Sequence, residues 1–189
     1  MPFMIKISIF FSFLYLVSEM MLLLTKRSVK KSAIKQKDRG SLIFMWTAIC
    51  AGLTFGFSNA RYTSWNMVDY FVASVGLLII VAGFIIRWTA IMQLKNDFTV
   101  DVAISNTHEL KTNGLYRIVR HPSYLGLLMI MTGEAVSMDS LGSFIVVVLP
   151  VTLSIFYRIY VEEKLLKEAF GETFKEYKRN TKRIIPYIY

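Results

Sequence analysis

Two clusters of ionisable and aromatic residues lie beside long apolar runs in the C-terminal half of this chain. The first, Arg120–Tyr124, combines a guanidinium, an imidazole and a phenol with a proline. The second follows a hydrophobic stretch and contains Arg158, Glu162 and Glu163. Ionisable groups next to a bilayer core are costly and usually mark a functional site. The pairing of the clusters therefore predicts an enzyme rather than a simple membrane anchor.

The first cluster has the residue order of a helix start, because proline is favoured at the first helical position and Pro122 stands there. Free backbone N–H groups and the positive end of the helix dipole would suit an anionic ligand group. Arg120 and His121 add side-chain donors. Tyr116 and Tyr124 add flat surfaces for an aromatic ring or a sulfonium.

In the second cluster, Arg158 and Glu162 are four residues apart and share one helix face, with Glu163 about a third of a turn away. An arginine can orient a carboxylate, and a glutamate can accept from an ammonium or a ribose hydroxyl. One ligand that carries both charges and an aromatic base would fit the two clusters together. Taken singly, the same residues also fit ordinary flanking charges and interface aromatics of a membrane protein.

The composition predicts a membrane protein of one domain, residues 1–189. Hydrophobic residues make up 54% of the chain and the mean hydropathy is +0.48, more apolar than ordinary soluble domains. The net charge of +9 would suggest nucleic-acid binding in a soluble protein. Here the basic residues fall between apolar runs, so we expect no nucleic-acid partner. The single cysteine, Cys50, excludes a disulfide framework and a cysteine-based metal cluster.

Five apolar runs predict an all-α integral membrane protein with about five transmembrane helices. They cover residues 3–24, 42–58, 68–92, 123–136 and 141–160. A helix needs about 20 residues to cross a hydrocarbon core of roughly 30 Å, so the fourth run is short for a full span. Only a few residues separate the last two runs, which predicts a C-terminal helical hairpin. We expect Pro150 to kink the second helix of that hairpin.

Basic residues predict the orientation. They crowd after the first, third and fifth runs, whereas one of the other two connections holds a single arginine and the other has no basic residue. The positive-inside rule then places the N-terminus outside and the C-terminus in the cytoplasm. Residues 1–94 would hold three spans, and residues 95–189 the cofactor-binding catalytic region, including the hairpin.

After residue 160, apolar residues recur at helical spacing and predict a cytoplasmic amphipathic helix. This helix either lies on the membrane surface or continues the fifth span and closes over a pocket. Glu19 and Arg87 stand alone within or at the edge of apolar runs. Packing pairs or snorkelling explain such residues better than catalysis does.

The order of residues from about Lys95 onward resembles the isoprenylcysteine carboxyl methyltransferase family. Phospholipid methyltransferases share parts of the pattern, and the first three runs match only in hydropathy. The motifs that carry the resemblance are His108-Glu109-Leu110, Asn113-Gly114-Leu115-Tyr116, Arg120-His121-Pro122-Ser123-Tyr124-Leu125-Gly126, Arg158, Glu162-Glu163 and 170–177.

The resemblance implies an integral-membrane enzyme that uses S-adenosylmethionine and releases S-adenosylhomocysteine, with its pocket at the cytoplasmic face. By matched position, the cofactor-binding residues would be Asp101, His108, Glu109, Leu110, Lys111, Tyr116, Arg120, His121, Pro122, Ser123, Tyr124, Glu162 and Glu163. Glu109 and Lys111 depart from the family, which usually has apolar residues after its histidine. Contacts at these two positions would therefore come from the backbone.

The resemblance also implies that Arg158 faces the methyl acceptor, a lipid or lipid-linked small molecule. A carboxylate acceptor is ionised at neutral pH and needs no general base. A thiol or amine acceptor would need one, and His121 is the candidate. Two alternatives remain open at this point. One is a sterol-reductase-like enzyme that uses NADPH, although its family generally has Asn before the tyrosine of this helix start. The other is a non-catalytic scaffold or small transporter.

Overall fold

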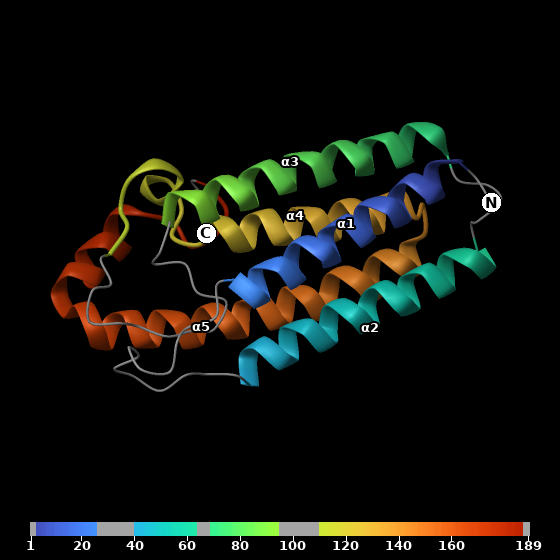
Figure 1. Ribbon diagram of the computed structural model, residues 1–189. Coiled ribbons are helices and arrows are strands. Elements are labelled where there is room, and N and C mark those ends of the chain that lie inside the picture. The colour runs from blue at the N-terminus through green and yellow to red at the C-terminus, as the bar shows by residue number, and fades with distance from the viewer. Residues whose placement is uncertain (1–2, 26–39, 64–68, 95–109, 187–189) are drawn as a thin grey trace.

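The computed structural model describes residues 3–25, 40–63, 69–94 and 110–186, and these are almost entirely helical (Figure 1). The elements are α1 (Phe3–Thr25), α2 (Gly40–Thr63), α3 (Tyr70–Leu94), the 3₁₀ turn η1 (Gly114–Arg117), α4 (Pro122–Ser137) and α5 (Leu141–Asn180). In these ranges the only strand-like pairing is an isolated parallel bridge between Val119 and Lys182. The predicted all-α class is confirmed.

Four of the helices are long and apolar enough to cross a membrane. Among the described residues these are Lys6–Leu24, Gly40–Tyr62, Tyr70–Leu94 and Leu141–Asn180. The remaining helix, α4, has 16 residues. At ~1.5 Å per residue it is about 24 Å long, shorter than a typical hydrocarbon core. All five predicted runs form helices, but the count of five full-length spans is not confirmed.

The helices lie side by side in one bundle, with α2 along α5 and α3 along α4 (Figure 1). A short turn joins α4 to α5, which is the predicted hairpin. That turn lies at the same end of the bundle as the N-terminus, and the first turn of α4 lies at the opposite end. The residues of the two chemical clusters therefore meet at one end of the bundle.

Glycines on facing positions bring α3 and α4 into close contact. A Cβ atom on Gly76 would lie 2.7 Å from the carbonyl oxygen of Gly133, and one on Gly83 would lie 2.8 Å from that of Gly126. Small residues allow such backbone approach between membrane helices. At both glycine pairs, the backbone of one helix occupies the space where a side chain of the other would stand. These contacts fix the register of α4 on α3. This register sets the position of the first turn of α4.

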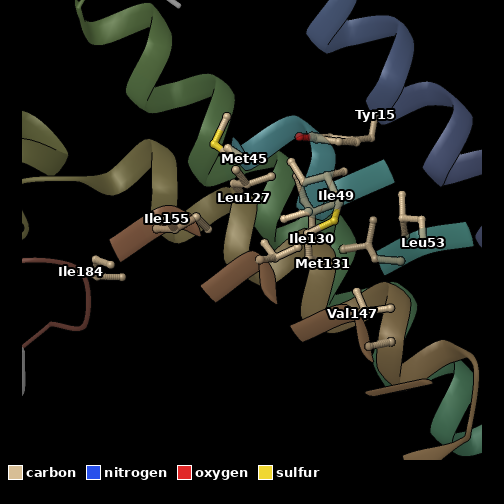
Figure 2. Close-up of a cluster of buried hydrophobic side chains, with 14 of the residues drawn as sticks. Tyr15, Met45, Ile49, Leu53, Leu127, Ile130, Met131, Val147, Ile155 and Ile184 are labelled. Carbon is tan, nitrogen blue, oxygen red and sulfur yellow. The ribbon is translucent and has the colours of Figure 1, made fainter. Parts of the chain in front are cut away.

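Apolar side chains from several helices fill the space between them (Figure 2). Tyr15 of α1, Ile49 of α2, Ile130 and Met131 of α4 and Val147 of α5 are buried there. Large apolar side chains also cover the outside of the bundle, which suits a lipid environment. The core ties both halves of the hairpin to the N-terminal helices.

α5 consists of two helical segments that meet at a kink at Gly171. The longer segment, residues 141–170, is about 45 Å long, more than the thickness of a hydrocarbon core. The residue with non-helical angles is Gly171, at φ 53° and ψ −120°, so no such break accompanies Pro150. A positive φ favours glycine. After this bend the chain turns back toward η1, seen in red in Figure 1.

The expected amphipathic helix after residue 160 is thus an extension of α5. Phe174 and Tyr177, two residues of its apolar face, are buried against the rest of the protein. This supports the interpretation in which the segment continues the fifth run and packs over the site. A separate helix lying on the membrane surface is not confirmed.

Candidate active site

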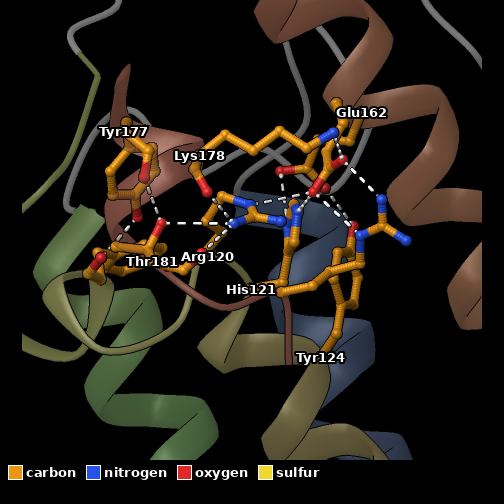
Figure 3. A network of polar contacts seen from close by, with 10 residues as sticks. Arg120, His121, Tyr124, Glu162, Tyr177, Lys178 and Thr181 are labelled. Atoms are coloured by element: carbon orange, nitrogen blue, oxygen red, sulfur yellow. Dashed lines mark hydrogen bonds and ion pairs between the residues drawn. The ribbon is translucent and has the colours of Figure 1, made fainter. Parts of the chain in front are cut away.

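The hydroxyl of Tyr124, in the first turn of α4, bridges two residues of α5 (Figure 3). Arg158 Nε donates to the Tyr124 hydroxyl at 2.9 Å, and that hydroxyl donates to Glu162 Oε2 at 2.9 Å. Arg158 Nη1 also donates to the Ser41 hydroxyl of α2 at 3.1 Å. The arginine is 3% exposed, whereas the Glu162 side chain keeps 31% of its surface. Arg158 therefore connects α2, α4 and α5 next to one partly exposed carboxylate, that of Glu162.

Glu163, the next residue, is the centre of a second set of contacts. Its Oε1 accepts from Arg120 Nε at 3.1 Å and from Arg183 Nε at 3.2 Å, and lies 3.4 Å from His121 Nε2. Its Oε2 accepts from Arg183 Nη2 at 3.0 Å and lies 3.5 Å from Lys178 Nζ. Four basic side chains thus surround a carboxylate that is 8% exposed.

These contacts lower the pKa of Glu163. The residue lies beyond Tyr160, past the apolar, membrane-spanning part of α5. Burial alone would raise the pKa of its carboxyl group. The hydrogen bonds from His121 and Arg183, together with the charge of Arg120, outweigh burial and hold the pKa well below its usual range. Glu163 is therefore an ionised structural anchor in this arrangement.

The segment after α5 folds back over the residues that precede α4. The Arg120 amide donates to the Lys182 carbonyl at 2.8 Å, and the His121 amide donates to the Arg183 carbonyl at 3.1 Å. Arg120 Nη1 also donates to the carbonyl of Thr181. The C-terminal segment and the start of α4 are therefore held together by backbone and side-chain bonds, as Figure 3 shows in part.

Tyrosines attach η1 to the same assembly. The Tyr177 hydroxyl donates to the Tyr116 carbonyl at 2.6 Å, and the Tyr116 hydroxyl donates to the Ala90 carbonyl at 3.4 Å. Burial raises the pKa of the Tyr116 phenol well above its ordinary value, so the group stays protonated as a donor. Leu115 N–H donates to Gln93 Oε1 at 2.9 Å. η1 is thus fixed to the end of α3 and to the end of α5.

The start of α4 offers fewer free amides than the sequence predicts. The amides of Arg120 and His121 bond to the C-terminal segment, and those of Tyr124 and Leu125 both donate to the His121 carbonyl at 3.1 Å. The expectation that free N–H groups here receive an anion is wrong for these four amides. Side chains must supply most of the recognition.

Glu19 and Arg87, which the sequence leaves isolated, form a pair next to this helix start. Arg87 Nε donates to Glu19 Oε1 at 2.6 Å, and its Nη1 donates to the Ser123 carbonyl at 3.0 Å. Of the two explanations that the sequence left open, the structure favours packing over snorkelling, and it shows that the two residues pair with each other.

A polar hollow of about 380 Å³ lies on the side of this assembly where Tyr177 and Thr181 stand in Figure 3. This volume falls within the usual range for small-molecule sites. Its lining residues are Thr112, Arg117, Thr173, Glu176, Tyr177, Asn180 and Thr181. The hollow therefore lies between η1 and the bent end of α5, next to the residues that contact Arg120.

Most of the predicted site residues come together at this end of the bundle. They are Tyr116, Arg120, His121, Pro122, Ser123, Tyr124, Arg158, Glu162 and Glu163. Leu110 and Lys111 are not part of the hydrogen-bonded network among the described residues. Asp101, His108 and Glu109 lie outside the described residues.

Sequence reasoning missed several residues of this network. Ser41, Tyr177, Thr181 and Arg183 touch it from α2 and from the end of the chain. In the sequence, Arg183 is one basic residue of the tail, and Tyr177 belongs to an apolar face and to the motif 170–177, with no contact predicted for either. No local pattern pairs them with residues 20 or more positions away.

The sequence matches the phospholipid methyltransferase family over residues 71–173. Protein-S-isoprenylcysteine O-methyltransferase B of Arabidopsis thaliana is 33% identical over 121 residues, which cover 63% of this chain and 61% of the relative. The probable protein-S-isoprenylcysteine O-methyltransferase of Oryza sativa subsp. indica is 31% identical over 121 residues, 63% of each chain. The Mus musculus protein-S-isoprenylcysteine O-methyltransferase is 29% identical over 150 residues, 78% of this chain and 53% of the relative.

The chain therefore spans less than two thirds of the length of these curated relatives. A solved structure of the eukaryotic intramembrane Ras methyltransferase, isoprenylcysteine carboxyl methyltransferase, has the same fold. It superposes with a TM-score of 0.66 over 80% of this chain and 54% of that chain, at 24% identity. The family match covers more than half of the sequence and includes both chemical clusters, so this chain belongs to the phospholipid methyltransferase family.

Proposed function

We propose that this chain is an integral-membrane methyltransferase that uses S-adenosylmethionine and methylates a lipid-associated acceptor. The observation that carries the proposal is the Tyr124 hydroxyl between Arg158 and Glu162, which joins the two predicted clusters in one site. The relatives named above are protein-S-isoprenylcysteine O-methyltransferases, which supports the same class of reaction. A carboxylate of the isoprenylcysteine type is therefore the acceptor we favour.

The residues around Glu162 fit the groups of this cofactor. Glu162 is partly exposed, donates nothing and has acceptor capacity beyond its bond to Tyr124, so it can accept from an ammonium or a ribose hydroxyl. The His121 and Tyr124 rings lie 5.8 Å apart beside it, and aromatic faces attract cationic groups. When bound, S-adenosylmethionine supplies an electrophilic methyl group on a sulfonium sulfur.

Arg158 would orient the acceptor. A guanidinium binds a carboxylate through parallel N–H bonds, and this one is already fixed by Tyr124 and Ser41. An acceptor carboxylate would compete with the Ser41 hydroxyl for the guanidinium. Holding the nucleophile in attack geometry is the main contribution that the protein must make. If the acceptor is a thiol or an amine, His121 would accept its proton.

We further propose that the site faces the cytoplasm and that α4 acts as a fifth, short crossing. The basic connections after α1 and α3 and the basic residues after the fifth apolar run support this orientation, because positive charge accumulates in cytoplasmic loops. The hairpin turn, which contains Asp139, lies at the other end of the bundle. The N-terminus would then be outside.

Calorimetric titration of the detergent-purified protein with S-adenosylhomocysteine tests the cofactor assignment. We expect saturable binding by the wild-type protein and at least tenfold weaker binding, about 1.4 kcal/mol, by Glu162→Ala. His121→Ala should show a similar loss. Glu172→Ala is the matched control, since Glu172 is an exposed glutamate of α5 paired only locally with Lys175. Absence of binding by folded wild-type protein would overturn the proposal.

A further inference from the structure

A buried ion pair between α1 and α3 lies against the first turn of α4. Arg87 Nε donates to Glu19 Oε1 at 2.6 Å, and Arg87 Nη1 donates to the Ser123 carbonyl at 3.0 Å. Arg87 is 5% exposed and Glu19 is 2% exposed. The guanidinium therefore connects an acidic side chain of α1 to the backbone of the residue between Pro122 and Tyr124.

The chemistry of this contact constrains the backbone of α4. A carbonyl has two lone pairs, so the Ser123 carbonyl can accept from the guanidinium in addition to a helical amide. The guanidinium is planar, and its donors point in fixed directions. An unpaired charge at this depth would be strongly unfavourable, so Glu19 is needed to keep Arg87 in place. The two residues thus act as one unit on Ser123.

Close packing leaves α4 little freedom to move around this contact. A Cβ atom on Gly126 would lie 2.6 Å from the Arg87 amide nitrogen and 2.7 Å from the Arg87 Cβ. The first turn of α4 therefore lies directly on the backbone of Arg87. Rotation or sliding of α4 would break both the glycine contact and the bond to the Ser123 carbonyl.

We propose that Glu19 and Arg87 are positioning residues of the active site. They set the place of Ser123, and through it the Tyr124 hydroxyl between Arg158 and Glu162. This role concerns catalysis only if the site is the methyltransferase site of the proposed function, on which the inference rests. The family match begins at residue 71, so α1 lies outside it. Through Glu19, α1 would nevertheless help to position the site.

Two double variants separate positioning from stability. Glu19→Leu/Arg87→Met removes both charges, and replacement of a buried ion pair by apolar residues is often neutral for folding. Glu19→Arg/Arg87→Glu keeps an ion pair, but a carboxylate at position 87 cannot donate to the Ser123 carbonyl. In both, we expect melting temperatures close to wild type and a dissociation constant for S-adenosylhomocysteine about tenfold higher, equivalent to ~1.4 kcal/mol.

A second readout does not depend on the cofactor. In both double variants, we expect amide hydrogen exchange to become at least fivefold faster over residues 123–127 and to stay unchanged over residues 130–137. Unchanged exchange over 123–127 would overturn the inference whether or not the wild-type protein binds S-adenosylhomocysteine. Failure of the wild-type protein to bind would instead overturn the proposed function.

Glu134→Gln is the matched control. Glu134 Oε2 accepts from the Ser8 hydroxyl at 2.6 Å, so this buried glutamate also connects α1 to α4, but near the far end of α4. We expect wild-type affinity and wild-type exchange over 123–127 for this variant. If the double variants do not fold, Arg87→Lys decides. It keeps the pair with Glu19 but lacks the planar fork, and an unchanged exchange rate over 123–127 would contradict the proposal.

Discussion

At the residue scale, neighbouring glutamates with the same chemistry have different environments. Glu162 is partly exposed, accepts from the Tyr124 hydroxyl and lies 3.9 Å from His121 Nδ1, whereas Glu163 is buried among four basic side chains. A carboxylate that is already surrounded by basic groups is poorly suited to bind a further ammonium. We therefore propose ligand contact for Glu162 and structural anchoring for Glu163, although the resemblance implies cofactor contact for both.

Glu163→Gln tests the anchoring role. The amide keeps the shape of the side chain but leaves the surrounding basic groups without a counter-charge. Breaking a buried pair costs about 3–5 kcal/mol, so we expect a clearly lower melting temperature. We also expect faster proteolysis after residue 180. Glu172→Gln, on the exposed face of the same helix, should change stability by less than about 0.5 kcal/mol. Equal stability of the two variants would contradict the anchoring role.

The lowered pKa of Glu163 predicts a pH dependence of stability. Its folded-state pKa lies below the unfolded value of about 4.3, so the unfolded state binds the proton first as the pH falls. The stabilisation is complete above that value and is lost as the pH falls toward the folded pKa. Between pH 5 and pH 3, as approximate limits, the wild-type melting temperature should fall more steeply than that of Glu163→Gln. Parallel curves would show that Glu163 does not titrate in this way.

At the element scale, α5 has two structural roles. Its first half packs in the bundle, and its second half extends past the apolar region and bends back at Gly171. The bend brings Tyr177 to Tyr116 and Thr181 to Arg120. A straight helix would carry both residues away from the start of α4. The site is therefore closed by a backbone angle that only glycine adopts readily.

Gly171→Ala isolates this backbone effect, because no atom lies within 4 Å of the position that its Cβ would take. An alanine at positive φ costs roughly 1–2 kcal/mol. We expect lower thermal stability and faster amide exchange over residues 173–183. Glu172→Ala, at the neighbouring helical position, is the control and should leave that exchange unchanged. Wild-type exchange in Gly171→Ala would mean that the bend does not depend on glycine.

At the scale of the whole molecule, the bundle separates two ends with different charge. The basic residues in the second half of α5 and the candidate active site belong to one end, and the hairpin turn with Asp139 belongs to the other. Long apolar helices and lipid-compatible outer surfaces join the two ends. A site built at a helix end in this way would be within reach of an acceptor that stays dissolved in the lipid.

Cysteine labelling tests the orientation. Cys50 is the only cysteine of the chain, so Cys50→Ser provides a background without thiols. In right-side-out vesicles, we expect Asp139→Cys in this background to react with a membrane-impermeant maleimide from the outside. Glu172→Cys should react only after permeabilisation, because it would lie on the cytoplasmic side. The opposite pattern would reverse the proposed topology.

The sequence by itself determined the helical class, the positions of the apolar helices, the hairpin and most of the residues of the site. These follow from local rules: hydropathy, the length needed to cross a bilayer, proline at a helix start and the order of motif residues. The predicted role of Arg120, His121 and Tyr124 at one helix start needed no knowledge of distant contacts.

Only the tertiary structure determined which of those residues contact one another. The pairing of Glu19 with Arg87, the four basic side chains around Glu163 and the bend at Gly171 all depend on contacts between distant segments. A single sequence carries no distance between residues that lie 15 or more positions apart. Local patterns can therefore name the groups of a site, but close packing of the helices determines which group bonds to which.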